Sequence, residues 1–109
     1  MAALAVDPPA LQVPASGGVS AHQLVNSGAT RLAFKIRSSN NENYRLKPVY
    51  GFVEPGAASP VEVTRTDGPP KDDKLVVQFI EVPAEATDAQ EVFKSGVPQG
   101  EVILPMSAQ

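Results

Sequence analysis

The side chains in this sequence that are best suited to bind a charged partner are cations between positions 31 and 37. Three large apolar residues stand at every second position of this segment: Leu32, Phe34 and Ile36. The alternate positions hold Arg31, Ala33, Lys35 and Arg37. Because successive side chains of a strand point to opposite faces, this pattern predicts a β-strand with an apolar buried face and a cationic face in water. Such cations can donate charge-assisted hydrogen bonds to carboxylates.

His22 is the only histidine of the chain, and a lone histidine builds neither a catalytic triad nor a metal site here. Its position two residues before Leu24 predicts that the ring points toward the core side of its strand. We therefore expect a partly buried ring that is hydrogen-bonded to a neighbour.

Three aspartates lie close together in the polar segment 66–73, which we expect to be an exposed loop: Asp67, Asp72 and Asp73. This segment lacks the regular ligand spacing and the closing glutamate of an EF-hand, so we expect solvent-exposed turn residues and no metal site. The chain also lacks the glycine-rich phosphate-binding motifs and the GxSxG motif of hydrolases. The sequence predicts no enzymatic activity, no cofactor and no small-molecule substrate.

Net charge and composition narrow the range of partners. Nine lysines and arginines stand against twelve aspartates and glutamates, so the formal net charge is −3 and no overall positive field attracts nucleic acid. The lack of cysteine excludes disulfide scaffolds and thiolate metal sites and is compatible with a reducing compartment, so we expect a cytoplasmic protein. We find neither a signal-peptide pattern nor a long apolar run, and we expect no direct membrane insertion.

The 109 residues fit one domain, 1–109, and eleven prolines and eight glycines divide the chain into short segments that favour strands. Besides 31–37, strands are predicted at 4–6, 11–13, 19–26, 61–64, 75–82 and 101–104. We expect the first two to be one opening strand that is broken at Asp7–Pro9 and switches sheets there. Apolar residues on both faces predict that 75–82 is central. Pro105 is expected to stop the last strand.

Turn residues predict one connection between strands. Gly28, within Asn26–Ala29, suits a tight turn, so we expect 19–26 and 31–37 to form a β-hairpin.

One short helix is predicted at 87–94. Thr87 is expected to cap its first turn, and Asp88 lies favourably near its positive end. Gly96 is expected to end it, which limits the helix to one or two turns.

Five groups of residues resemble, in order and spacing, the major sperm protein domain. They are Leu4–Pro9 with Asn26, Phe34–Ser39, Tyr44–Pro48, Gly51–Gly56 and Lys74–Gln78. The resemblance covers nearly the whole chain. It implies an all-β fold, a seven-stranded immunoglobulin-like β-sandwich, which agrees with the strands predicted from alternation. It also implies that Pro48 occupies the position of the family's cis proline and acts as a structural pivot.

The resemblance further implies a binding face. Receptors of this family in the endoplasmic reticulum hold short acidic, aromatic-containing peptides on an outward sheet surface. The matching positions in this sequence are Lys35, Arg37, Ser38, Ser39, Lys74 and Val76. The receptors carry threonines at the two serine positions and methionine at the valine position, so the aromatic pocket is expected to be shallower here. The alternative is a solvated strand face that holds no ligand.

Two functions follow as expectations from the resemblance. The first is a non-enzymatic structural or interaction protein of nematode sperm, associated with the cytoskeleton of major sperm protein. We expect it to self-associate, because a sandwich has sheet edges and flat faces that can pair symmetrically. The second is a module that reads acidic, aromatic-containing motifs of partner proteins through its cationic face. Both imply protein partners, including further copies of this chain or major sperm protein, in the sperm-cell cytoplasm.

Overall fold

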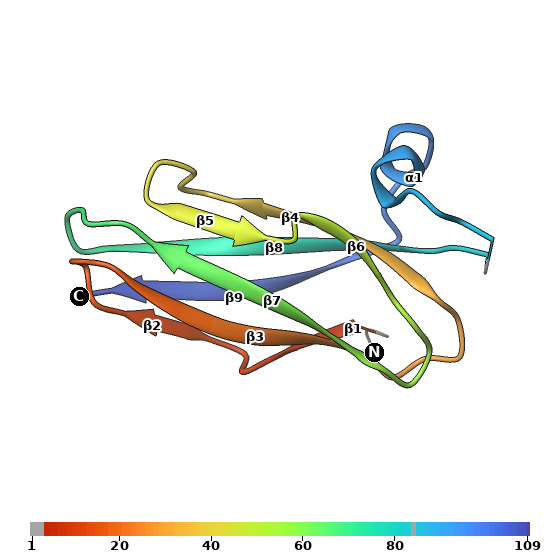
Figure 1. Ribbon diagram of the computed structural model, residues 1–109, viewed down its shortest axis with the longest axis horizontal. Coiled ribbons are helices and arrows are strands. Elements are labelled where there is room, and N and C mark those ends of the chain that lie inside the picture. The colour runs from red at the N-terminus through yellow and green to blue at the C-terminus, as the bar shows by residue number, and fades with distance from the viewer. Residues whose placement is uncertain (1–3, 84) are drawn as a thin grey trace.

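The computed structural model describes residues 4–83 and 85–109, which form two packed β-sheets and one short helix (Figure 1). Sheet A contains, from edge to edge, β1 (Leu4–Asp7), β3 (Gly18–Asn26), β7 (Ala58–Arg65) and β5 (Tyr44–Lys47). Sheet B contains, in the same sense, β2 (Leu11–Val13), β9 (Gly100–Ala108), β8 (Lys71–Glu81), β4 (Leu32–Ser38) and β6 (Tyr50–Val53). The helix α1 (Ala89–Ser95) stands beside β6 at one end of the molecule (Figure 1). The fold is an all-β sandwich.

The alternation of apolar residues builds the core between the two sheets. On β4, Leu32, Phe34 and Ile36 are buried, which confirms the predicted strand and its core face. Leu24 of β3 and Val63 of β7 belong to the same core and contribute from sheet A. Because buried side chains stand at every second position, the intervening positions of sheet B point outward.

β8 lies in the middle of sheet B, between β9 and β4, which confirms that 75–82 is central. Its inward residues Leu75 and Val77 belong to the core between the sheets. Its outward residue Ile80 packs in a second apolar cluster that includes Ala33 and Ala89 of α1. The helix therefore covers one end of the outer face of sheet B and leaves the rest exposed.

The predicted hairpin between β3 and β4 is wrong, because these strands lie in different sheets. Asn26 is fully buried and organises the crossing between them. Its Nδ2 donates to the carbonyl oxygens of Thr30 at 2.8 Å and Val53 at 3.0 Å, and its Oδ1 accepts from the N–H of Gly28 at 3.0 Å. A turn signal is local, so it does not distinguish a return within one sheet from a passage to the other.

The resemblance implied seven strands, and the described residues form nine. Two strands are interrupted at prolines and continue in the opposite sheet. The opening strand passes from β1 to β2 through residues 8–10, which confirms the predicted break and change of sheet. In the same way β5 passes to β6 through residues 48–49. The bonds Asp7–Pro8 and Lys47–Pro48 are both cis, the second as expected from the resemblance.

The last strand is longer than predicted. β9 continues through Pro105 to Ala108, so the expectation that Pro105 ends it is wrong. β2 pairs with β9 only from Met106 onward, so at Pro105 β9 has β8 as its single neighbour. Proline lacks a backbone donor, and sheets accept it at such locally unpaired edges.

The helix begins later than predicted. Its N-cap is Asp88, not Thr87, because the Asp88 carboxylate accepts from the backbone N–H groups of Gln90 at 3.0 Å and Glu91 at 3.3 Å. Gly96 ends it, as predicted. With seven residues, α1 is far too short to span a bilayer, and no helix in the described part of the chain has the length and apolarity to do so.

Candidate protein-binding face

The outer face of sheet B brings together side chains from three neighbouring strands. Seven of these side chains point outward, and we call the surface that they form the β4–β8–β9 face. They are Lys35, Arg37, Lys74, Val76, Gln78, Glu101 and Ile103. The strand register arranges six of them in two rows, Lys35–Gln78–Glu101 and Arg37–Val76–Ile103. The seventh residue, Lys74, lies on β8 two positions before Val76. Segments far apart in the sequence thus present cations, apolar groups and one carboxylate on a single surface.

A shallow hollow of about 260 Å³ lies on this face. Its lining residues are Arg37, Ser38, Ser39, Lys74, Val76, Gln78 and Glu101. The structure therefore brings together five of the six positions that the resemblance assigned to a binding site. No ion pair within residues 4–83 and 85–109 includes Arg37 or Lys74. The hollow offers the cations Arg37 and Lys74 and the carboxylate of Glu101 beside Val76. The two cations suit a ligand carboxylate next to an apolar group.

The other two cations of the predicted strand face lie outside the hollow. The Lys35 ammonium lies 5.7 Å from the ring centroid of Tyr50 on β6, within cation–π range. Arg31 is held by the segment that precedes α1: its Nη1 donates to the carbonyl oxygen of Ala86 at 2.6 Å. Its Nε also pairs with the carboxylate of Glu54 at 2.8 Å. Arg31 therefore connects the helix segment to the sheet, and Lys35 stands opposite Gln78, which lines the hollow.

The hydroxyls of Ser38 and Ser39 already have partners. Ser38 Oγ donates to the carbonyl oxygen of Asn40 and accepts from its N–H, both at 3.0 Å. Ser39 Oγ donates to Oδ1 of Asp73 and accepts from the N–H of Lys74, both at 3.0 Å. A hydroxyl has one proton and two lone pairs, so one lone pair on each serine remains for a ligand. Both serines mainly shape the turn that follows β4.

Asp73 anchors that turn from the neighbouring strand. Its side chain is 3% exposed, its Oδ2 accepts from Nδ2 of Asn40 at 3.2 Å, and Lys71 Nζ lies 3.7 Å from its Oδ1. The expectation that these aspartates are turn residues of an exposed loop is therefore wrong for Asp72 and Asp73, because β8 already begins at Lys71. Asp72 is exposed, as expected, whereas Asp73 is not. Among the described residues, no group of three or more histidine, aspartate or glutamate side chains is placed to hold a metal ion.

Two residues of the face were missed at the sequence level. Glu101 places a carboxylate opposite Gln78, and Ile103 places an apolar side chain, 54% exposed, opposite Val76. The alternation of 101–104 contained the signal, since Leu104 is buried and its neighbour Ile103 must point outward. What the sequence did not show is that β9 pairs with β8.

His22 is buried and hydrogen-bonded, as expected from its position in the alternation. Its Nε2 lies 2.7 Å from Oγ of Ser20, and its Nδ1 lies 3.0 Å from the carbonyl oxygen of Pro8. The ring therefore ties β3 to the segment between β1 and β2.

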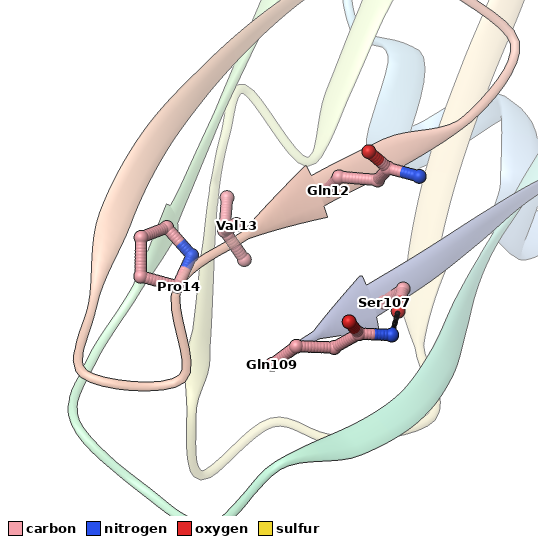
Figure 2. Close-up of a pocket in the computed structure, with 5 residues that line it drawn as sticks. All are labelled: Gln12, Val13, Pro14, Ser107 and Gln109. Carbon is pink, nitrogen blue, oxygen red and sulfur yellow. Dashed lines mark hydrogen bonds between the residues drawn. The ribbon is translucent and has the colours of Figure 1, made fainter.

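Two of the other hollows illustrate what lies away from the β4–β8–β9 face. One, of about 340 Å³, lies at the ends of the parallel strands β2 and β9, and Figure 2 shows its lining residues Gln12, Val13, Pro14, Ser107 and Gln109. None of these five side chains is charged, and Gln109 Nε2 donates to Ser107 Oγ at 3.3 Å. Pro48 lines the second hollow, with Lys47, Pro60 and Glu62. The structure thus does not bring Pro48 to the β4–β8–β9 face.

Comparison with known sequences gives a consistent result. The profile of the MSP (Major sperm protein) domain matches residues 3–102. The chain is 58% identical over 105 residues to sperm-specific class P protein 16 of Caenorhabditis elegans, and the match covers 96% of both proteins. It is 56% identical, with the same coverage, to sperm-specific class P protein 10 of that nematode.

Solved structures show the same fold. SSP-19, an MSP-domain protein like family member in C. elegans, matches with a TM-score of 0.94 and 55% identity over 96% of this chain and 98% of its own. WR4, a C. elegans MSP family member, matches with a TM-score of 0.97 and 49% identity over the whole of both chains. The E. coli chaperone DraB matches 97% of this chain and 54% of its own with a TM-score of 0.71, but at 9% identity this shows likeness of fold alone.

Proposed function

This chain belongs to the MSP (major sperm protein) domain family, and from that premise we propose that it is a non-enzymatic interaction protein of nematode sperm. It associates with the cytoskeleton built by major sperm protein, in the sperm-cell cytoplasm, and it also self-associates. The observation that carries the proposal is the similarity, over 96% of the chain, to proteins named as sperm-specific in C. elegans. Its partners are therefore proteins.

The geometry supports binding to a protein surface. Ile103 is 54% exposed and stands in one row with Val76 and Arg37. Protein interfaces commonly combine an apolar centre with charged residues at the rim, and arginine is enriched in them. The rigid sheet beneath keeps this arrangement in place without a ligand.

Co-sedimentation tests the association with the cytoskeleton. Filaments assembled from purified major sperm protein are mixed with this chain and centrifuged, and the pelleted fraction of the chain is measured. We expect the chain to pellet with the filaments, and the double variant Arg37→Glu/Ile103→Asp to lose at least about tenfold in affinity. The matched variant Lys47→Glu/Val19→Asp changes exposed residues of sheet A and is expected to bind normally. A folded wild-type chain that stays in the supernatant at every filament concentration would contradict the association.

A second candidate function is the reading of acidic, aromatic-containing peptides, and the hollow on the β4–β8–β9 face favours it. Arg37 and Lys74 both line this hollow, and Val76 forms part of its floor. Carboxylates of an acidic segment would pair with the two cations, and an apolar or aromatic side chain would rest on Val76 and Ile103.

Titration with a short acidic, aromatic-containing peptide tests this second function. We expect heat of binding that weakens as salt rises, because the contacts are between charges near the surface. Lys74→Glu and Arg37→Glu are each expected to abolish binding without unfolding the chain, whereas Lys47→Glu leaves it unchanged. A peptide with its acids replaced by amides serves as the ligand control. Absence of heat at millimolar peptide would leave a solvated strand face as the correct interpretation.

A further inference from the structure

The β4–β8–β9 face carries opposite charges on its two sides. Lys35 stands on β4 and Glu101 stands on β9, in the same row, with the uncharged Gln78 of β8 between them. Neighbouring strands lie about 4.8 Å apart, so the two charged residues originate roughly 10 Å from each other. Within the described residues, neither takes part in an ion pair. The face thus displays both members of an ion pair that do not meet within one molecule.

Two copies of this face that are related by a two-fold axis have complementary charges. β8 is flanked by β4 on one side and β9 on the other. If two copies stack face to face about an axis along β8, then β9 of each copy lies over β4 of the other. The row Lys35–Gln78–Glu101 then meets the same row in reverse order. We propose that two copies of this chain pair in this way, with Glu101 of each copy against Lys35 of the other.

This inference rests on the self-association proposed above and names the surface that carries it. The second row gives the pair an apolar centre. Val76 lies on β8, and hence on the axis, where it meets Val76 of the other copy. The exposed Ile103 of each copy covers the aliphatic part of Arg37 of the other. α1 limits the contact beyond the row that contains Lys35. The next outward pair along β4 and β8, Ala33 and Ile80, is packed beneath the helix.

The pairing is expected to be weak, for two reasons. Three strands at about 4.8 Å and three rows at about 7 Å give a contact of roughly 300 Å² for each copy, below the roughly 800 Å² of a standard interface. Lys74 also lies on β8, so it meets Lys74 of the other copy, and this repulsion opposes the pair. The dimer should therefore form at high micromolar to millimolar concentration.

A charge swap tests the inference directly. The full chain is studied by sedimentation equilibrium up to millimolar concentration, and its amide NMR shifts are followed over the same range. Lys35→Glu and Glu101→Lys are each expected to weaken dimerisation about tenfold, because each places like charges together. The double variant Lys35→Glu/Glu101→Lys restores opposite charges in the dimer and is expected to recover to within about threefold of wild type.

The matched control swaps a pair on the other layer. Lys47 and Glu62 stand opposite each other on β5 and β7 of sheet A and are exposed. Lys47→Glu, Glu62→Lys and their combination are expected to leave dimerisation unchanged. Thermal unfolding of all variants shows that they remain folded.

Lys74→Gln separates self-pairing from peptide binding. Removal of the repulsion on the axis is expected to strengthen dimerisation by about threefold to tenfold, while binding of an acidic peptide weakens. Weaker dimerisation of this variant would overturn the proposed arrangement. The proposed arrangement would also be overturned if the wild-type chain dimerised but the Lys35→Glu and Glu101→Lys variants dimerised equally well. Self-association itself would in that case remain supported. A chain that is strictly monomeric at millimolar concentration would refute the pairing and self-association together, while co-sedimentation would still test the association with filaments.

Discussion

Ser39 donates a hydrogen bond to Oδ1 of Asp73 at 3.0 Å, and this bond joins two residues that are 34 positions apart in the chain. It closes the turn after β4 onto the neighbouring strand β8. The backbone beside Arg37 and Lys74 is thereby set by a carboxylate that lies almost completely beneath the surface. The shape of the candidate binding face therefore depends on a residue that does not itself face a partner.

Replacement of Asp73 by alanine is expected to destabilise the chain by about 2 kcal/mol. Ser39 Oγ and Asn40 Nδ2 would both lose an acceptor, and hydrogen bonds to charged groups contribute about 1.5–3 kcal/mol each, part of which water recovers. Urea unfolding measures the change. The control is Asp72→Ala, an exposed neighbour on the same strand, which is expected to change stability by less than about 0.5 kcal/mol. Equal effects of the two variants would show that Asp73 has no anchoring role.

Asn26→Ala is expected to cost about 3 kcal/mol. It removes the donors to the carbonyl oxygens of Thr30 and Val53; the bond to Val53 is buried and the bond to Thr30 is partly buried. An unsatisfied buried group costs about 1–3 kcal/mol, and loss of the second bond adds to this. Thermal and urea unfolding give the value. Gln23→Ala, at an exposed position of the same strand, is the matched control, and a comparable loss there would point to strand propensity and not to the crossing.

Arg65→Lys is expected to destabilise by about 1–2 kcal/mol although it keeps the charge. Arg65 is 3% exposed, and its Nε donates to the carbonyl oxygen of Ala15 at 3.2 Å while its Nη2 donates to that of Pro69 at 2.7 Å. A planar guanidinium bridges two such groups, whereas a single ammonium does not reproduce the fork. Hydrogen exchange of the two loop segments should rise. Arg45→Lys, at an exposed site on β5, provides the comparison, and an equally mild effect at both sites would contradict the bridging role.

Gly51→Ala is expected to cost about 1–3 kcal/mol because the site has no room for a methyl group. A Cβ there would lie 2.7 Å from Cζ of the fully buried Phe34, which the packed core does not allow to move freely. Gly18→Ala has the opposite expectation: its Cβ would meet only ordinary contacts at 3.4 Å or more, and loss of chain entropy in the unfolded state should stabilise by about 0.4–1 kcal/mol. Calorimetry of both variants gives the sign of each change. A loss at Gly18 as large as at Gly51 would argue against a packing cause.

The parts of the fold that depend on neighbouring residues could be predicted from the sequence. Leu32, Phe34 and Ile36 revealed their buried face because alternation is a property of one strand. The connection after β3 could not be predicted in this way. Asn26 bonds to Val53, 27 positions away on a strand of the other sheet, and the turn residues alone do not reveal this long-range contact.

The residues of the candidate site also fall into two groups, those that could be predicted from the sequence and those that could not. The resemblance assigned Arg37, Lys74 and Val76, and they do line one hollow. The buried anchor Asp73 was mistaken for a loop residue, because its hydrogen-bond donors come from the turn after β4. Glu101 was overlooked because its place beside the cations depends on the pairing of β9 with β8. Long-range pairing, which local patterns do not encode, placed both residues.

The two strand interruptions join the two sheets of the sandwich by short covalent links. Only residues 8–10 join β1 to β2, and only residues 48–49 join β5 to β6, so the main chain bridges the layers by very short links at two sites. Sliding of one layer along the other would stretch these covalent links as well as disturb the side chains between them. A pull applied to one face should therefore pass to the opposite face through the backbone.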